Sequence, residues 1–220
     1  MNYRRILDLK RRRRRKLKKY FEVREVERIY GEKMLNMLLE EQEKTLKLPR
    51  RHASFFETSS KTGKELSVAQ SYFQILESQS DEKLVSLTLA EDPPDVEILT
   101  DNKRRIGVEI TELVNAKAIE LQIKEHRKYV FELLSWNADK FLKVLQSIIS
   151  SKADKCGSVS DKYDELTLLI FTDEPMLTSE MMKSYLDGAS FSDSEKFSSI
   201  YILTSYEPSN KGKSLIQVGI

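Results

Sequence analysis

The strongest constraint on the fold of this chain is a pair of adjacent strand-like segments that carry acid among their apolar residues. Residues 91–113 read EDPPDVEILTDNKRRIGVEITEL. In the second segment, Ile106, Val108 and Ile110 alternate with small or polar residues, a period of two that predicts a strand with two distinct faces. Glu109 and Thr111 therefore share the opposite face. The turn residues TDNK between the two segments predict a β-hairpin.

The register of this hairpin follows from burying its apolar residues on one side of a sheet. The predicted pairs are Val96 with Val108 and Ile98 with Ile106. This register requires a loop of odd length, such as residues 101–103, and it sets Asp95 directly across from Glu109. A two-residue loop would instead place Asp95 beside Val108, within the apolar face.

Two facing carboxylates need a compensating positive charge, because like charges on cross-strand neighbours, with Cβ atoms about 5 Å apart, are destabilising. A divalent cation is one candidate, since Mg²⁺ takes hard oxygen ligands and binds through one or two carboxylates. Such a metal would lower the pKa of a bound water and stabilise charge on a phosphate oxygen. A protein cation is the second candidate, and the nearby ones are Arg104, Arg105, Lys124 and Lys128. A solvated strand face is the simplest alternative, because most charged residues on strands meet water.

The remaining segments alternate between helical and strand periodicity. The predicted elements are a helix over 64–79, strands in KLVSLTLAED, PPDVEIL and RRIGVEITEL, a long helix over about 116–150, a buried strand in DELTLLIFTDEP, a helix in TSEMMKSYLDG, a strand in FSSIYILTSY and a last edge strand in SLIQVGI. A meander of strands followed by crossover helices predicts an α/β (mixed α+β) fold, with a central mixed sheet of about five strands flanked by helices. Trp136 and its apolar neighbours are expected to pack in the core.

The N-terminal part of the chain is strongly basic. Its charged run consists of Lys10, Arg11, Arg12, Arg13, Arg14, Arg15, Lys16, Lys18 and Lys19. Such a run would contact phosphates with an affinity that falls as salt rises. A nuclear localisation signal or an anionic membrane surface would use the same chemistry, and of these partners we expect nucleic acid.

Composition and spacing divide the chain into three parts. Residues 1–48 predict a basic helical extension, because apolar residues recur at helical spacing after the charged run. This extension is expected to dock on the main domain or to form a homodimer. Residues 49–63 have the composition of a linker, and residues 64–220 form the α/β domain.

Several classes of protein are disfavoured by composition. The single cysteine, Cys156, cannot form an internal disulfide, which favours a reducing compartment such as the cytoplasm. The sequence contains no apolar run near the roughly 20 residues of a membrane span and no leader-like segment, so we expect a soluble protein without a membrane partner. With 7 glycines and no glycine-rich phosphate loop, a nucleotide-binding site is disfavoured. One Cys and 2 His cannot build a zinc site of the usual kind.

Pro94-Asp95 and Glu109-Ile110-Thr111, set in the order helix, strand, hairpin, helix and strand, resemble the restriction-endonuclease-like, or PD-(D/E)xK, nuclease superfamily. Its signature is Asp, a spacer of variable length, then Glu or Asp, any residue and Lys, and the resemblance covers residues 64–205. It implies a restriction-endonuclease-like core and Mg²⁺-dependent (or Mn²⁺-dependent) hydrolysis of phosphodiester bonds, with DNA as the substrate. The resemblance further implies that Asp95, Glu109 and the backbone carbonyl of Ile110 ligate the metal. An acid from the first helix completes the set in some members, and here Glu65 is preferred over Glu77.

Thr111 stands where the family usually has a lysine. A hydroxyl can hydrogen-bond to a water molecule but supplies no positive charge on the phosphate. Similar nucleases recruit a lysine or glutamine from the next helix, and the candidates here are Gln122, Lys124 and Lys128, with Gln122 preferred. The expected catalytic set is therefore Asp95, Glu109, Thr111 and Gln122. The alternatives are a nuclease-like domain without activity that binds nucleic acid or protein, and a structural protein that dimerises through its N-terminal helices.

Overall fold

The computed structural model describes residues 61–79, 82–91, 93–115, 135–174, 176–205 and 212–219. The predicted basic run at 10–19, the N-terminal extension, and Gln122, Lys124 and Lys128 lie outside the described residues. Among the helices that are described, none is both long and apolar enough to cross a membrane.

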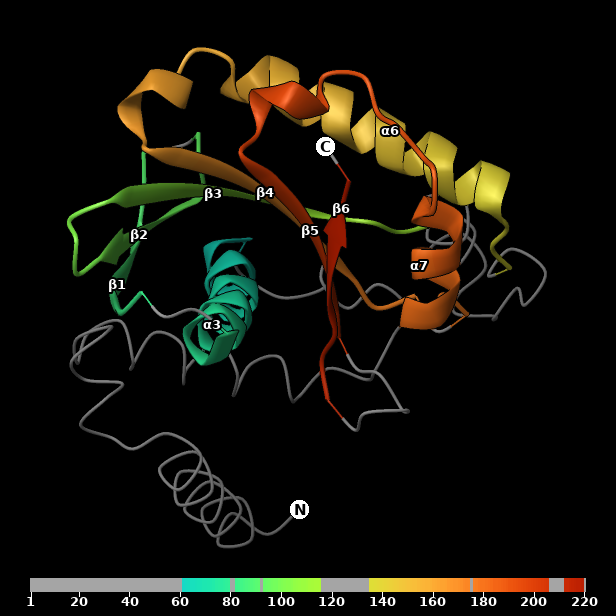
Figure 1. Ribbon diagram of the computed structural model, residues 1–220, viewed down its shortest axis with the longest axis horizontal. Helices are drawn as coiled ribbons and strands as arrows, with labels where there is room; N and C mark the ends of the chain where they lie inside the picture. The colour runs from blue at the N-terminus through green and yellow to red at the C-terminus, as the bar shows by residue number, and fades with distance from the viewer. Residues whose placement is uncertain are drawn as a thin grey trace, which may run out of the picture.

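The described part of the chain forms one six-stranded mixed sheet whose strands lie side by side in chain order (Figure 1). The strands are β1 (Leu84–Leu89), β2 (Val96–Thr100), β3 (Arg105–Glu112), β4 (Glu165–Thr172), β5 (Ser199–Thr204) and β6 (Leu215–Val218). The first three strands form an antiparallel meander, β3, β4 and β5 run parallel to one another, and β6 is antiparallel to β5. The predicted mixed sheet is confirmed, with six strands where about five were expected.

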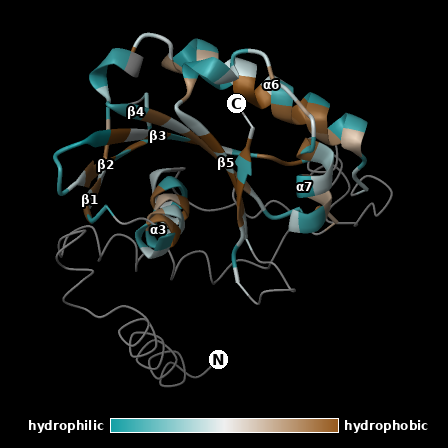
Figure 2. Ribbon diagram, in the orientation of Figure 1, coloured by the Kyte–Doolittle hydropathy of each residue, from teal (hydrophilic) through white to brown (hydrophobic). Residues whose placement is uncertain are grey.

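Three described helices flank the sheet: α3 (Lys61–Gln79), α6 (Ala138–Cys156) and α7 (Ser179–Leu186). In Figure 1, α3 covers one face of the sheet, and α6 and α7 lie on the other. Two buried clusters match these layers, because Ile106, Val108 and Ile110 pack with α3, whereas β4 and β5 residues such as Leu168 and Ile200 pack with α6. Figure 2 shows hydrophobic residues along the central strands and along one side of α6.

The hairpin between β2 and β3 has the predicted register. Val96 pairs with Val108 and Ile98 pairs with Ile106. The connection spans residues 101–103, and the Thr100 amide donates to the Arg104 carbonyl at 3.0 Å to close it. Lys103 adopts the left-handed conformation, with φ of 66°, as a three-residue hairpin loop requires of its last residue. The odd-length loop is therefore confirmed.

The helix predicted over 116–150 is wrong as one continuous element. Residues 116–134 lie outside the described residues, and 135–137 are not helical. Asn137 is extended, and its side chain accepts the Lys140 amide at 2.9 Å, so α6 begins after it. A side-chain cap of this kind satisfies an amide of the first turn, and Asn is among the residues that favour it. The helix then continues beyond Ser150 to Cys156, whereas α3 begins at Lys61, within the predicted linker.

Candidate functional site

Asp95 is attached to β3 by a direct hydrogen bond. The Ile110 amide donates to Asp95 Oδ2 at 2.7 Å, and Asp95 is only 7% exposed. Continuing the register of β2 and β3 by one residue sets Asp95 across from Glu109. The two acids thus meet at the start of β2, as the hairpin pattern predicts.

Close packing around Gly107 supports this placement of Asp95. A Cβ atom at Gly107 would lie 3.0 Å from Pro94 Cγ and 3.0 Å from Tyr163 Cγ. A glycine on β3 therefore allows both rings to rest directly on the strand. Since Pro94 immediately precedes Asp95, this contact positions the backbone that carries the carboxylate.

Glu109 belongs to β3, and its side chain lies under α6 with 0% of its surface exposed. Its Oε1 accepts hydrogen bonds from two lysines of α6, Lys152 at 2.7 Å and Lys155 at 2.8 Å. Lys152 Nζ also donates to the Ile110 carbonyl at 3.3 Å. Glu109 Oε2 is buried without a hydrogen-bond partner in this part of the structure. Glu109 Oε1 thus accepts from two ammonium groups, whereas Oε2 has no such donor among the described residues.

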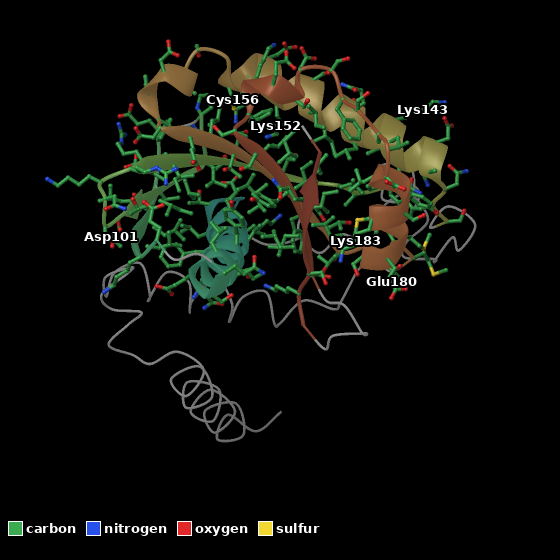
Figure 3. The ribbon with its side chains drawn as sticks, in the orientation of Figure 1. Asp101, Lys143, Lys152, Cys156, Glu180 and Lys183 are labelled. Atoms are coloured by element: carbon green, nitrogen blue, oxygen red, sulfur yellow. The ribbon has the colours of Figure 1, made fainter. Side chains whose placement is uncertain are left out.

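Burial and neighbouring charges act on the pKa values around Glu109. Burial and the Glu109 charge raise the pKa of Asp95, while the Ile110 hydrogen bond and the charges of Lys152 and Lys155 oppose that rise. Burial, followed by the Glu109 charge, raises the pKa of the Cys156 thiol to about 12. Figure 3 labels Lys152 and Cys156 on the part of α6 that lies over the sheet. The Cys156 thiol therefore stays protonated beside Glu109, where it is a weak hydrogen-bond donor.

The structure does not bring every predicted site residue to the acid pair. Thr111 is half-buried on the same face of β3 as Glu109. Glu65 is buried on α3, which packs against the opposite face of β3, and Glu77 is on the same helix. Within the described ranges, no three acids, histidines or cysteines are grouped so that they could hold a metal ion. The acid from the first helix therefore does not join Asp95 and Glu109.

The cations at the acid pair differ from the predicted arginines. Arg104 pairs with Glu82 and Glu165, and Arg105 pairs with Glu97, so both are bonded to other acids. The cations that pair with Glu109 are instead Lys152 and Lys155. They are three residues apart on one helix, a spacing that puts both side chains on the same face. Both lysines lie beyond the predicted end of the helix at Ser150, so the sequence pattern did not connect them with Glu109.

A second set of buried acids lies at the carboxyl ends of β3 and β4. Glu112 is 8% exposed, and neither of its carboxyl oxygens has a hydrogen-bond partner among the described residues. Burial, followed by the charge of Asp173, raises the pKa of Glu112 to about 9; the Lys64 charge opposes the rise, and Glu174 adds to it. Burial and the neighbouring acids therefore favour the protonated form of Glu112 in the metal-free protein.

Glu174 has a structural role in the same region. Its Oε1 accepts the Asn115 amide at 2.6 Å, and its Oε2 accepts the Trp136 indole N–H at 2.9 Å. Trp136 is buried in the core formed with α6, as predicted. Glu174 thus joins the end of β3 to the residues that precede α6.

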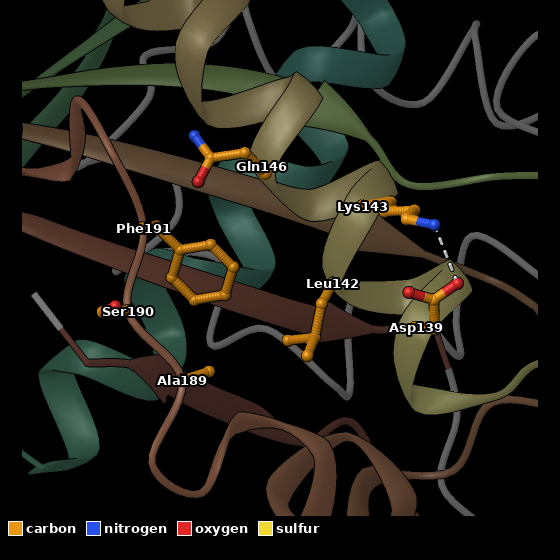
Figure 4. Close-up of a pocket in the computed structure, with 7 residues that line it drawn as sticks. All are labelled: Asp139, Leu142, Lys143, Gln146, Ala189, Ser190 and Phe191. Carbon is orange, nitrogen blue, oxygen red and sulfur yellow. Dashed lines mark hydrogen bonds and ion pairs between the residues drawn. The ribbon is translucent and has the colours of Figure 1, made fainter.

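A surface cavity of about 390 Å³ lies between α6 and residues 189–191 (Figure 4). Leu142 and Phe191 line it together with the ion-paired Asp139 and Lys143, whose charged atoms are 3.0 Å apart. Among the described residues, none of those bonded to Asp95 or Glu109 lines this cavity. The carboxylate pair and the cavity are therefore separate features of the molecule.

Comparisons with protein-family models, with curated proteins and with solved structures find no match to this chain.

Proposed function

We propose that this protein is a Mg²⁺-dependent nuclease that hydrolyses phosphodiester bonds in DNA. The observation that carries the proposal is the pairing of Asp95 with Glu109 across two adjacent strands, where Asp95 is fixed by the Ile110 amide. Buried acids cost free energy unless they are compensated, so such pairs are concentrated at functional sites.

The oxygen atoms at this position suit a hard divalent cation. Asp95 and Glu109 offer carboxylates, Glu109 Oε2 has no hydrogen-bond donor among the described residues, and the Ile110 carbonyl is adjacent. Mg²⁺ is commonly bound through one or two carboxylates, and substrate phosphates and waters complete its shell. When bound, the metal would supply a more acidic water and stabilise negative charge on the phosphate.

Lys152 supplies the positive charge that Thr111 lacks. Its Nζ contacts both Glu109 Oε1 and the Ile110 carbonyl, the same two residues from which the metal would take ligands. An ammonium group next to these atoms is placed to offset charge on a phosphate oxygen. In this proposal Lys152 takes the role that the PD-(D/E)xK pattern gives to a lysine at position 111, and Gln122 is not required for that role.

The order of elements supports the same proposal. A helix, an antiparallel meander, a crossover helix and a parallel strand follow one another from α3 to β4. This is the order expected of a restriction-endonuclease-like core, in which the acids lie on the second and third strands. The basic residues 10–19 would add sequence-independent contacts to DNA phosphates.

One observation favours a second function, that of a nuclease-like module without activity. The two ammonium groups on Glu109 Oε1 already compensate the acid, as in a structural ion pair. In that case the domain would bind nucleic acid or protein without cleavage. Binding of DNA in the absence of Mg²⁺, undiminished when Asp95 or Glu109 is changed, would favour this module.

The test of the nuclease proposal is a plasmid-nicking assay with Mg²⁺ or Mn²⁺. We expect the wild-type protein to nick supercoiled DNA, and Asp95→Asn and Glu109→Gln to abolish nicking. Glu180→Gln is the matched control, because Glu180 is an exposed acid on α7 (Figure 3). Nicking that survives in Asp95→Asn, or that is absent from folded wild-type protein with a range of DNA substrates, would contradict the proposal.

The contribution of the basic run is tested separately by changing Arg11 through Arg15 to Gln. We expect weaker binding to DNA and a shallower dependence of affinity on salt, because fewer phosphate contacts release fewer counterions. Unchanged affinity would show that the run does not contact DNA.

A further inference from the structure

The acid pair and the two lysines form a group whose formal charges cancel. Counted in their ordinary ionised forms, Asp95 and Glu109 carry two negative charges, and the two lysines bonded to Glu109, Lys152 and Lys155, carry two positive charges. Addition of a divalent cation to this group would leave an excess of two positive charges in a largely buried place. Buried charge without compensation is strongly unfavourable, so a bound cation requires further anions.

The two lysines are the groups that can respond to a change of charge. Their side chains are 20% and 34% exposed, whereas Glu109 is completely buried on a central strand. A lysine carries its ammonium on a flexible stem with three rotatable donors. Lys152 and Lys155 can therefore turn toward solvent, whereas the Glu109 carboxylate stays on β3.

We infer that Lys152 and Lys155 are counter-ions to Glu109 in the metal-free protein and transfer to phosphates of the DNA when a divalent cation occupies the acid pair. The inference rests on the proposed function and specifies how its site couples metal to substrate. Phosphate oxygens then supply the anionic charge that the cation makes necessary. Each lysine exchanges one charge-assisted hydrogen bond for another, which keeps the site compensated in both states.

This exchange makes metal binding and DNA binding mutually reinforcing. If the cation strengthens DNA binding by some factor, DNA must strengthen cation binding by the same factor. It also changes the number of phosphates that the protein neutralises. For duplex DNA, the slope of log affinity against log salt changes by about 0.9 for each added phosphate contact, or about 1.8 for two lysines.

The experiment measures the slope of log affinity for duplex DNA against log salt, once with Ca²⁺ and once with a chelator. Denaturing gels check that the DNA remains intact. The variants are Lys152→Met and Lys155→Met, and we expect each to fold because one lysine still compensates Glu109. Lys143→Met is the control, because Lys143 is exposed on the same helix and pairs with Asp139 instead. Circular dichroism and thermal melting confirm the fold of each variant, and calorimetry measures Ca²⁺ binding directly.

We expect Ca²⁺ to steepen the slope in the wild type, and each of the two variants to lose about 0.9 of that steepening. The control should steepen as the wild type does. Equal steepening in all four proteins, with Ca²⁺ bound, would overturn the inference and leave the nuclease proposal intact. Absence of Ca²⁺ binding or of DNA binding by the wild type would overturn both.

Discussion

The Ile110 amide donates a hydrogen bond of 2.7 Å to Asp95 Oδ2, and this contact joins the start of β2 to the middle of β3. Both groups are buried. The bond therefore both fixes an acid of the proposed site and satisfies a backbone donor that water does not reach.

Replacement of Asp95 should consequently destabilise the fold as well as remove activity. Asp95→Ala leaves the Ile110 amide without an acceptor, and we expect a loss of about 1–3 kcal/mol in the free energy of unfolding. Asp95→Asn retains an acceptor oxygen and should cost less. Urea denaturation measures both, with Asp101→Asn in the exposed hairpin loop as a control that stays near the wild-type value. Equal stability of Asp95→Ala and the wild type would show that the bond contributes nothing.

Gly107→Ala should disturb the contact that positions Asp95. The added methyl would meet Pro94 and Tyr163 at 3.0 Å, and neither contact involves the end of a flexible side chain. Overpacking of this kind costs about 1–3 kcal/mol, so we expect the urea midpoint to fall by a corresponding amount. Gly219→Ala is the control, because an added Cβ there has no neighbouring atom within 4 Å among the residues described. A wild-type midpoint for Gly107→Ala would refute the packing argument.

Glu174→Ala should separate Trp136 from the end of β3. It removes the acceptors of the Asn115 amide and of the indole N–H, and each buried donor left unsatisfied costs about 1–3 kcal/mol. The chain has one tryptophan, so fluorescence reports on this site alone. We expect lower stability and an emission shifted to longer wavelength, which indicates exposure of the indole to water. An unshifted spectrum in a folded Glu174→Ala protein would contradict this role.

Glu112→Gln should make the stability of the protein less dependent on pH. The folded protein holds the pKa of Glu112 at about 9, above the ordinary value of 4.5, so the folded state retains a proton that the unfolded state releases between these values. Stability from this group is complete below pH 4.5 and declines as the pH rises toward 9. Glutamine has no such proton, so the advantage of Glu112→Gln over the wild type should grow from pH 5 to pH 9. Parallel stability curves for the two proteins would show that Glu112 does not titrate in this way.

The hairpin was predictable because one rule decides it. Burying Val96 and Ile98 with Val108 and Ile106 allows only an odd-length loop, and a shift of one residue would expose every apolar side chain. The burial of β4 was predicted from a different signal, the continuous apolar run in DELTLLIFTDEP, which is typical of a strand buried on both faces. The sixth strand was predicted as an edge strand in SLIQVGI but was left out of the expected count of about five. Its four residues are too few to establish a clear alternation of apolar and polar positions.

The cations of the site were not predictable from local pattern. Lys152 lies 43 residues from Glu109 in sequence, so only the crossover from β3 through α6 brings the two together. Helical periodicity also predicted a helix through residues 135–137. In the structure these residues are not helical, and the Asn137 side chain caps the start of α6. Glu65 was attributed to the site by resemblance, whereas the packing of α3 on the opposite face of β3 separates it from Asp95 and Glu109.

The nuclease proposal requires Asp95 and Glu109 to hold a divalent cation together. Crystals soaked in Mn²⁺ test it most directly, because manganese gives an anomalous signal that an ammonium group does not. We predict a peak between the two carboxylates, with Glu109 released from at least one of Lys152 and Lys155. Density without a peak, in which both lysines remain on Glu109 Oε1 at saturating Mn²⁺, would show that the acid pair does not bind a divalent cation.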